Sequence, residues 1–478
     1  MKIAILRERA GGETRVAATP ETIAKFIGLG ASVSVEKGAG EASRILDSHY
    51  TDAGAKVEAT AAAALKDADI VLTVRRPQAS ALKGAKKDAL VIGALDPYGH
   101  EDDIAALAKA GFSAFTMEFM PRITRAQVMD VLSSQANLAG YQAVIEASHA
   151  YGRALPMMMT AAGTVRAAKV FVMGAGVAGL QAIATAKRLG GAVSATDVRA
   201  AAGEQVESLG AKFIMTDALK DASGEGGYAR ELTKEEQAAQ AELVAAHIAK
   251  QDIVITTALI PGRPAPKLVT KAMVESMAPG SVIVDLAAER GGNVELTKPG
   301  ETIVHKDVTI IGLTNLQGSI PATASQLYAK NLLAFLETMV DKEAKALNVN
   351  WDDELVKATL LTRGGAVVHP NFADVPAKPA AKKAPARSTT SKASTAKSAG
   401  AKASTAKAAS TSKPAAADKP AAKPAARKAP AAKSGAAGAS TAAKSTAAKS
   451  AAKPAASKST TTRKTTARKP AAKKDGDA

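Results

Sequence analysis

Midway along the chain an apolar run meets three closely spaced glycines, and this stretch narrows the possible folds more than any other. Residues 168–173 (A-K-V-F-V-M) have the composition of a buried strand, and G-A-G-V-A-G follows at 174–179, ahead of an Ala-rich helical pattern. Gly174 permits a tight turn, Gly176 lets the backbone approach a phosphate, and Gly179 permits close packing of helix on strand. The N–H groups of a helix N-terminus attract anions. The stretch therefore predicts a parallel α/β domain that binds the pyrophosphate of a dinucleotide.

A carboxylate stands where such a domain would contact the adenosine ribose. The next strand is expected at Ala192–Thr196 and is followed by Asp197, Val198 and Arg199, with Asp197 eighteen residues after Gly179. Asp197 could accept hydrogen bonds from ribose hydroxyls and would repel a 2′-phosphate, so we expect NAD(H) in preference to NADP(H). Arg199 is a complication, because an arginine at this point can accommodate a 2′-phosphate. The alternative is a structural α/β unit without a ligand.

Short β-rich runs alternate with helical patterns over residues 1–375, which indicates α/β architecture with two Rossmann-like, doubly wound parallel-sheet domains and an interdomain cleft. We expect a first α/β domain at 1–122, a bridging helix at 123–152 and an NAD-binding domain at 153–323. A C-terminal helical region at about 324–372 could pack back on the first domain. The expected strands are Lys2–Leu6, Ser32–Glu36, Ile70–Val74, Leu90–Gly93, Ala114–Glu118, Val170–Met173, Ala192–Thr196, Phe213–Met215, Asp252–Thr256, Val282–Leu286 and Thr309–Gly312.

Residues 376–478 differ in composition from everything before them. This tail holds 24 of the 63 Lys and Arg but 3 of the 45 Asp and Glu, so it carries a net charge of +21 and leaves −3 for residues 1–375. From Ala377 onward it contains no aromatic or branched aliphatic residue, and we expect it to be disordered. It is either a polycationic arm for nucleic acid or an anionic membrane, or a solubilising extension.

The residue inventory excludes several classes of chemistry. Without cysteine the chain has no disulfide, no thiolate metal site and no cysteine nucleophile, which is compatible with a reducing cytosol. We expect no signal peptide and no membrane-spanning segment, because no run of about 18 apolar residues occurs. We also expect no metal and no acid or base residue, since hydride transfer between two nicotinamides requires no proton relay. The six histidines show no metal-ligand or catalytic spacing: His49, His100, His149, His247, His305 and His369.

A polar stretch at 121–135, P-R-I-T-R-A-Q-V-M-D-V-L-S-S-Q, opens the expected bridging helix. Arg122, Gln127, Asp130 and Ser133 carry donors and acceptors that suit a carboxamide and a ribose. The alternative is helix capping on a solvated face. Sequence alone favours neither interpretation.

Two further segments could reach the same ligand. A Gly-rich turn at Gly227 precedes Tyr228 and is typical of a mobile lid, or simply of a flexible turn. The run T-T-A-L-I-P-G-R-P at 256–264 leaves a strand at the carboxyl edge of the expected sheet, where ligands of doubly wound folds bind.

Together these motifs resemble a known family. They are E-T-R-V-A-A-T-P at 13–20, the polar stretch at 121–135, G-A-G-V-A-G-L at 174–180, G-G-Y-A at 226–229, T-T-A-L-I-P-G-R-P-A-P-K at 256–267 and G-S-V-I-V-D-L-A-A at 280–288. Over about residues 1–372 the chain is similar to the soluble NAD(H)-binding domain I of the alpha subunit of proton-translocating NAD(P) transhydrogenases. It resembles the split form, in which other chains supply the membrane part.

The resemblance implies a set of cofactor-binding residues. Those implied are Arg122, Gln127, Asp130 and Ser133 at the nicotinamide end, Val177, Asp197, Val198 and Arg199 at the adenosine end, and Gly227, Tyr228, Gln240 and Leu259 elsewhere along the cofactor, Tyr228 belonging to a mobile loop. It further implies a homodimer, NADP(H) on a partner beta subunit, and membrane subunits that couple hydride transfer to proton movement. The chain would then be cytoplasmic and peripheral on the inner membrane, held there by those subunits.

Two other functions stay open. Alanine dehydrogenase is similar in fold and shares the opening that contains Arg15, but that activity needs a lysine and a histidine in the first domain, and Arg75 and Asp96 stand at the corresponding runs. The other hypothesis is an NAD-sensing protein whose tail binds nucleic acid. The tail has no aromatic residue for base stacking, so such binding would be non-specific.

Overall fold

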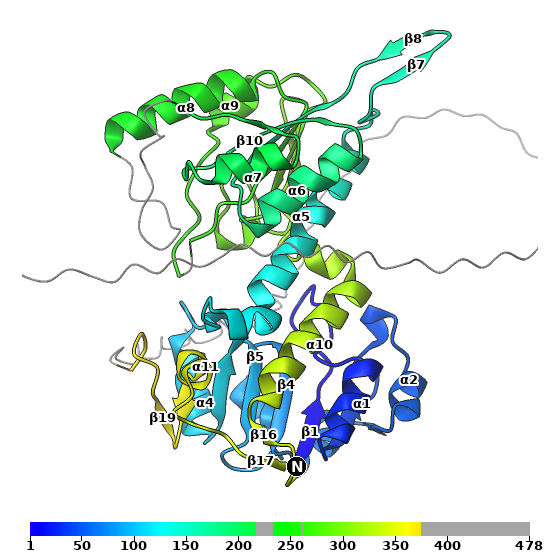
Figure 1. Ribbon diagram of the computed structural model, residues 1–478, viewed down its shortest axis with the longest axis vertical. Coiled ribbons are helices and arrows are strands. Elements are labelled where there is room, and N and C mark those ends of the chain that lie inside the picture. Colours follow the sequence, from blue (N-terminus) through cyan, green and yellow to red (C-terminus); the bar gives the residue numbers. More distant parts are fainter. Residues whose placement is uncertain (217–232, 261, 374–478) are drawn as a thin grey trace, which may run out of the picture. The chain divides into compact units, whose positions relative to one another are not determined.

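The computed structural model describes residues 1–216, 233–260 and 262–373, and this region folds around two parallel β-sheets (Figure 1). The first sheet has the strand order β3-β2-β1-β4-β5-β6, and every neighbouring pair is parallel. This is the order of a doubly wound fold, with its switch point between β1 and β4. The strands are β1 (Lys2–Ile5), β2 (Ser32–Glu36), β3 (Lys56–Glu58), β4 (Ile70–Arg75), β5 (Leu90–Ala94) and β6 (Ser113–Thr116).

The second sheet repeats this order and adds one strand. It runs β11-β10-β9-β12-β13-β15-β14, and only β14 is antiparallel to its neighbour among these described strands. The predicted α/β class with two parallel sheets is thus confirmed. The strands are β9 (Lys169–Met173), β10 (Ala192–Thr196), β11 (Lys212–Phe213), β12 (Ile253–Thr256), β13 (Val282–Asp285), β14 (Thr302–His305) and β15 (Val308–Ile311).

Helices connect the parallel strands, because such strands require crossover connections. No helix in the three described ranges has both the length and the apolar composition of a membrane span. The helices are α1 (Pro20–Gly28), α2 (Asp47–Asp52), α3 (Ala61–Leu65), α4 (Glu101–Lys109), α5 (Val131–Ala150), α6 (Val177–Arg188), α7 (Ala202–Ser208), α8 (Lys234–Ile248), α9 (Lys271–Glu275), α10 (Pro321–Glu337) and α11 (Glu354–Thr359). Short hairpins are formed by β7 (Met158–Thr160) with β8 (Gly163–Val165), β16 (Val340–Asp341) with β17 (Ala346–Leu347), and β18 (Thr362–Arg363) with β19 (Ala366–Val367).

The long helix α5 begins at Val131, later than the Ile123 start expected from the sequence. Thr124–Met129 form a 3-10 turn instead, and Asp130 is the N-cap, whose side chain accepts the Ser133 N–H at 2.9 Å. Apolar spacing continues through this turn, so it could not reveal where the α-helix starts. Figure 1 shows α5, in cyan, running alongside α6 of the second sheet.

Helix α10 follows the second sheet in sequence but packs in the core of the first. Its residues Tyr328, Leu332 and Phe335 are fully buried among side chains of β1, β2 and β4. The second sheet has its own apolar cores, which include residues of α5 and α6. Residues 376–478 lie outside the described residues.

Candidate functional site

The glycine loop follows β9, and each of its three glycines has a distinct physical role. Gly174 has a φ of +104°, and a Cβ on it would lie 2.4 Å from Thr257 Oγ1. A Cβ on Gly179 would lie 1.8 Å from the Gly174 carbonyl oxygen, so close helix–strand packing requires glycine there. Gly176 is the N-cap of α6, provides no side-chain cap, and has no atom within 4 Å of an ideal Cβ. The N-terminus of α6 therefore faces open space at Gly176.

Asp197 lies at the end of β10, beside this loop, and its carboxylate is already engaged. Oδ2 accepts the Ala175 N–H at 2.7 Å, and Oδ1 accepts the backbone N–H and Nε–H of Arg199, both at 2.9 Å. Arg199 Nη2 also donates to Oδ2 at 3.1 Å. Burial tends to raise the pKa of Asp197, but these hydrogen bonds outweigh it and hold the pKa below its usual range. The Arg199 side chain thus folds back on Asp197, and a ribose hydroxyl would have to share or replace these donors.

Gln240 on α8 faces the end of β10. Its Nε2 donates to Thr196 Oγ1 at 3.2 Å. Its buried Oε1 has no hydrogen-bond partner among the described residues, and a buried acceptor without a donor is costly. This oxygen is available to a donor from a ligand.

Apolar side chains surround the glycine loop without being buried. Val177 at the first turn of α6, Val198 after β10 and Leu259 after β12 are 42%, 37% and 53% exposed. Ile260 is 45% exposed. Large apolar residues clustered on a surface commonly mark a binding site.

The polar start of α5 contains one closed pair. Besides its cap to the Ser133 N–H, Asp130 accepts the Ser133 hydroxyl at 2.6 Å, and both residues are half-buried. Helix capping, one of the two interpretations of this stretch, therefore occurs at Asp130. Arg122 and Gln127 are exposed on the segment before the helix.

The crossing of α5 and α6 connects this polar stretch to the glycine loop. A Cβ on Gly140 would lie 2.0 Å from the Ala178 carbonyl oxygen, so the two helices touch backbone to backbone in the first turn of α6. Ser133 precedes Gly140 by two helical turns, or about 10 Å. The polar stretch thus lies a short distance along α5 from the glycine loop. Gly227 and Tyr228, the expected lid residues, lie outside the described residues.

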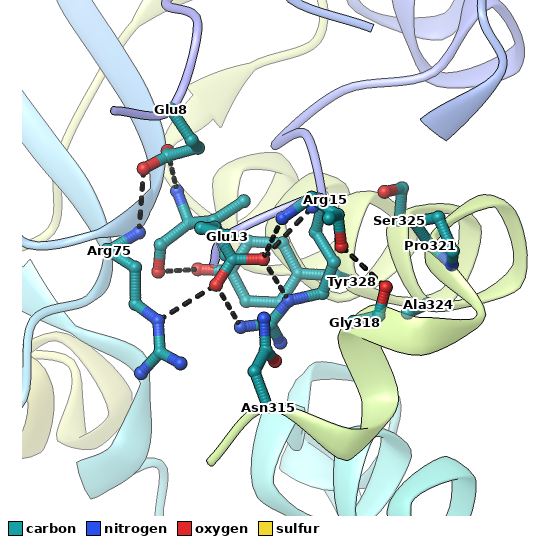
Figure 2. Close-up of polar contacts among 12 residues, drawn as sticks. Glu8, Glu13, Arg15, Arg75, Asn315, Gly318, Pro321, Ala324, Ser325 and Tyr328 are labelled. Atoms are coloured by element: carbon teal, nitrogen blue, oxygen red, sulfur yellow. Dashed lines mark hydrogen bonds and ion pairs between the residues drawn. The ribbon is translucent and has the colours of Figure 1, made fainter. Parts of the chain in front are cut away.

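A second polar cluster lies at the switch point of the first sheet, in the loop after β1. Glu13, with a side chain 1% exposed, accepts Arg15 Nε–H and Nη2–H, both at 2.8 Å, and Arg75 Nε–H at 2.9 Å (Figure 2). Burial tends to raise the pKa of Glu13, but the two arginines outweigh it and lower the pKa to about 2. Arg15 Nη1 also donates to Gln135 Oε1 on α5 at 2.8 Å.

Glu8, from the same loop, accepts the backbone N–H groups of Val74 at 2.5 Å and Arg75 at 3.3 Å. Burial outweighs these bonds and raises its pKa to about 7. Neither Glu8 nor Glu13 was predicted from the sequence. The available signal was a pair of carboxylates beside Arg15 in the loop that leaves the first strand.

Ion pairs join this cluster to the loop after β13. Arg75 Nη1 donates to Glu289 at 3.3 Å, and Arg290 pairs with Asp96, which follows β5. Both charged groups at positions 75 and 96 are therefore held by partners from the second half of the chain. Asp96 adopts a positive φ of +44°.

Comparison of the chain with known domains places this geometry in one family. Residues 4–139 match the N-terminal domain, and residues 143–370 the C-terminal domain, of alanine dehydrogenase/PNT. The chain belongs to the alanine dehydrogenase/PNT family. The tail lies beyond both matches.

Within the family the chain is similar to transhydrogenase subunits. It is 54% identical to the first of the two chains that form the NAD(P) transhydrogenase subunit alpha of Rhodospirillum rubrum, over 77% of this chain and 98% of that protein. The crystal structure of transhydrogenase from Sinorhizobium meliloti superposes with a TM-score of 0.71 at 60% identity, covering 77% of this chain and all of the other. An alanine dehydrogenase from Halomonas elongata is 28% identical over 77% of this chain and 95% of its own length.

Proposed function

We propose that this chain is the NAD(H)-binding portion of the alpha subunit of a proton-translocating NAD(P) transhydrogenase. Hydride passes directly between NADH bound here and NADP⁺ bound on a partner beta subunit, and membrane subunits couple that step to proton translocation. One observation carries the proposal: the open space at Gly176, at the N-terminus of α6 and beside Asp197. The space at this point admits a pyrophosphate close to the backbone N–H groups.

The surrounding residues fit a dinucleotide. The partnerless Gln240 Oε1 can accept a hydrogen bond from the adenosine end, next to Asp197. The exposed Val177, Val198 and Leu259 would lose water contact against the ligand. Arg122, Gln127, Asp130 and Ser133 would hold the nicotinamide end, the Asp130–Ser133 pair fixing both side chains.

Positioning is the contribution of these residues to catalysis. The bound nicotinamide supplies the hydride donor or acceptor, so the chain need provide no acid or base. Holding the two nicotinamides in contact geometry converts an encounter between two bound cofactors into a step within one complex. The paired Asp130 and Ser133 restrict the orientations available at that end of the site.

The geometry at positions 75 and 96 argues against an alanine dehydrogenase. Arg75 is held by Glu13 and Glu289, and Asp96 by Arg290, so neither is a free proton donor for an amino-acid substrate. The test is to incubate the purified chain with NADH, pyruvate and ammonia. We expect NADH binding without NADH oxidation; steady oxidation with alanine formed would replace the proposal by the dehydrogenase.

We further propose a homodimer. The hairpin β7–β8 extends from the second sheet in Figure 1 and carries a row of exposed apolar side chains. Met157, Met159 and Val165 are 64%, 82% and 38% exposed, which is costly unless another surface covers them. A second copy of the chain is the expected occupant, and sedimentation of a variant with Met157 and Met159 both changed to Ser should report a monomer.

The cytoplasmic face of the inner membrane is the proposed location, through the partner subunits. The net charge of +21 on residues 376–478 would add attraction to an anionic lipid surface, screened by salt. Deletion of the tail should weaken association with anionic vesicles at low salt and leave NADH binding unchanged. Equal vesicle binding with and without the tail would remove this role.

A further inference from the structure

Asn293 is fully buried and binds one short segment of the second sheet from both sides. Its Oδ1 accepts the Ala258 N–H at 3.0 Å, while its Nδ2 donates to the carbonyl oxygens of Ala258 and Pro266, both at 2.8 Å. The side-chain amide therefore pairs with Ala258 as a neighbouring strand would. All donors and the acceptor of the amide point at the segment that follows β12.

The backbone of Asn293 is held in place independently of that segment. Asp285, also fully buried, accepts the N–H groups of Ala287 and Val294, both at 3.0 Å, and so closes the turn that contains Asn293. Gly292 in this turn has a φ of +79°, and a Cβ on it would lie 2.6 Å from Asp285 Oδ2. The turn is thus a fixed platform from which Asn293 reaches Ala258.

The segment that Asn293 holds touches the glycine loop. Thr257 donates its N–H to the Met173 carbonyl at 2.9 Å and its hydroxyl to the Gly174 carbonyl at 3.2 Å. Leu259 and Ile260, the next residues after Ala258, are exposed. The orientation of these two side chains depends on how Ala258 is held.

We propose that Asn293 is a positioning residue for the dinucleotide site: by fixing Ala258 next to the glycine loop, it places Leu259 and Ile260 so that they cover bound NAD(H). The inference rests on the proposed function. An aspartate in its place would set a carboxylate oxygen against two carbonyl oxygens, so the segment would leave its position although the side-chain size is unchanged.

The test is NADH titration of the full-length chain by fluorescence. Asn293→Asp, and the milder Asn293→Ser, should raise the Kd for NADH at least about tenfold and speed hydrogen exchange at the Ala258 amide. Thr297→Val is the matched control. It removes a 2.6 Å hydrogen bond to Asp285 in the same turn but leaves Ala258 held, so it should lower the melting temperature without changing that Kd.

Leu259→Ala keeps the inference testable if both Asn293 variants fail to fold, because Leu259 is exposed and its loss leaves the fold intact. Leu259→Ala should weaken NADH binding, and Asn293→Ser should add little in that background. Wild-type affinity in Leu259→Ala, wild-type affinity in the Asn293 variants, or fully additive losses would each overturn the inference. Absence of NADH binding by the wild-type chain would instead overturn the proposed function.

Discussion

Glu8 and Glu13 lie in one loop, yet their surroundings move their pKa values in opposite directions. Burial raises the pKa of Glu8 from 4.5 to about 7, so folding favours its protonated form. Stability from this group is present below about pH 4.5 and is lost as the pH rises through 7. We expect the free energy of unfolding to fall by about 1–3 kcal/mol from this source between about pH 5 and 8, and Glu8→Gln to lack that slope. Denaturant melts across this range measure it; identical slopes would contradict the account.

Asp197 is the residue on which cofactor preference should depend. Asp197→Asn removes the negative charge that repels a 2′-phosphate and weakens the hydrogen bonds with Arg199, so we expect NADH to bind about tenfold more weakly and the preference over NADPH to narrow. Competitive titration with both cofactors gives the two affinities. Asp252→Asn is the matched control: Asp252 is paired with Arg166 before β12, so its loss should affect stability alone. An unchanged NADH/NADPH ratio in Asp197→Asn would count against the assigned role.

At the scale of elements, two glycines on α5 and α6 should separate folding from binding. Gly176 has a negative φ of −78° and open space at its Cβ, so Gly176→Ala should fold normally but obstruct the pyrophosphate and reduce NADH affinity at least about tenfold. Gly140→Ala would drive a methyl group into the Ala178 carbonyl and should cost about 1–3 kcal/mol of stability. Thermal melts and NADH titration distinguish the two variants. A destabilised Gly176→Ala with normal NADH affinity would contradict this assignment.

Sequence patterns predicted the elements where local chemistry alone decides the outcome. Runs such as Val170–Met173 are buried strands because they are continuous and apolar, and the glycine loop follows from its spacing. The three-residue strand β3 and the half-exposed edge strand β14 were missed, because neither carries a long apolar run.

The functional site divides in the same way. Asp197 and the three glycines could be predicted from the order of strand, loop and helix. Glu13 and Asn293 could not, because their partners at Arg75 and Ala258 come from other strand ends, and only the fold brings those ends together. Their chemistry depends on long-range contacts that no local pattern encodes.

At the scale of the whole described chain, polar contacts connect the two sheets. Thr14 donates to the Gly318 carbonyl at 2.5 Å, and Arg290 pairs with Asp96. Both side chains of the ion pair are about one-third exposed, so its contribution is modest. We expect a double-mutant cycle of Asp96→Asn and Arg290→Gln to give a coupling of about 0.5–1 kcal/mol in denaturant melts. Strict additivity would show that this contact does not hold the two sheets together.

The most direct measurement of the central claim is hydride transfer from NADH to an oxidised NAD analogue with NADP(H) present. The purified chain is assayed with and without membranes that carry the candidate partner subunits but lack this one. We expect transfer on mixing and none from either component alone, because each supplies one half of the hydride site. No transfer on mixing, with NADH consumed by the chain alone in the presence of pyruvate and ammonia, would contradict the account.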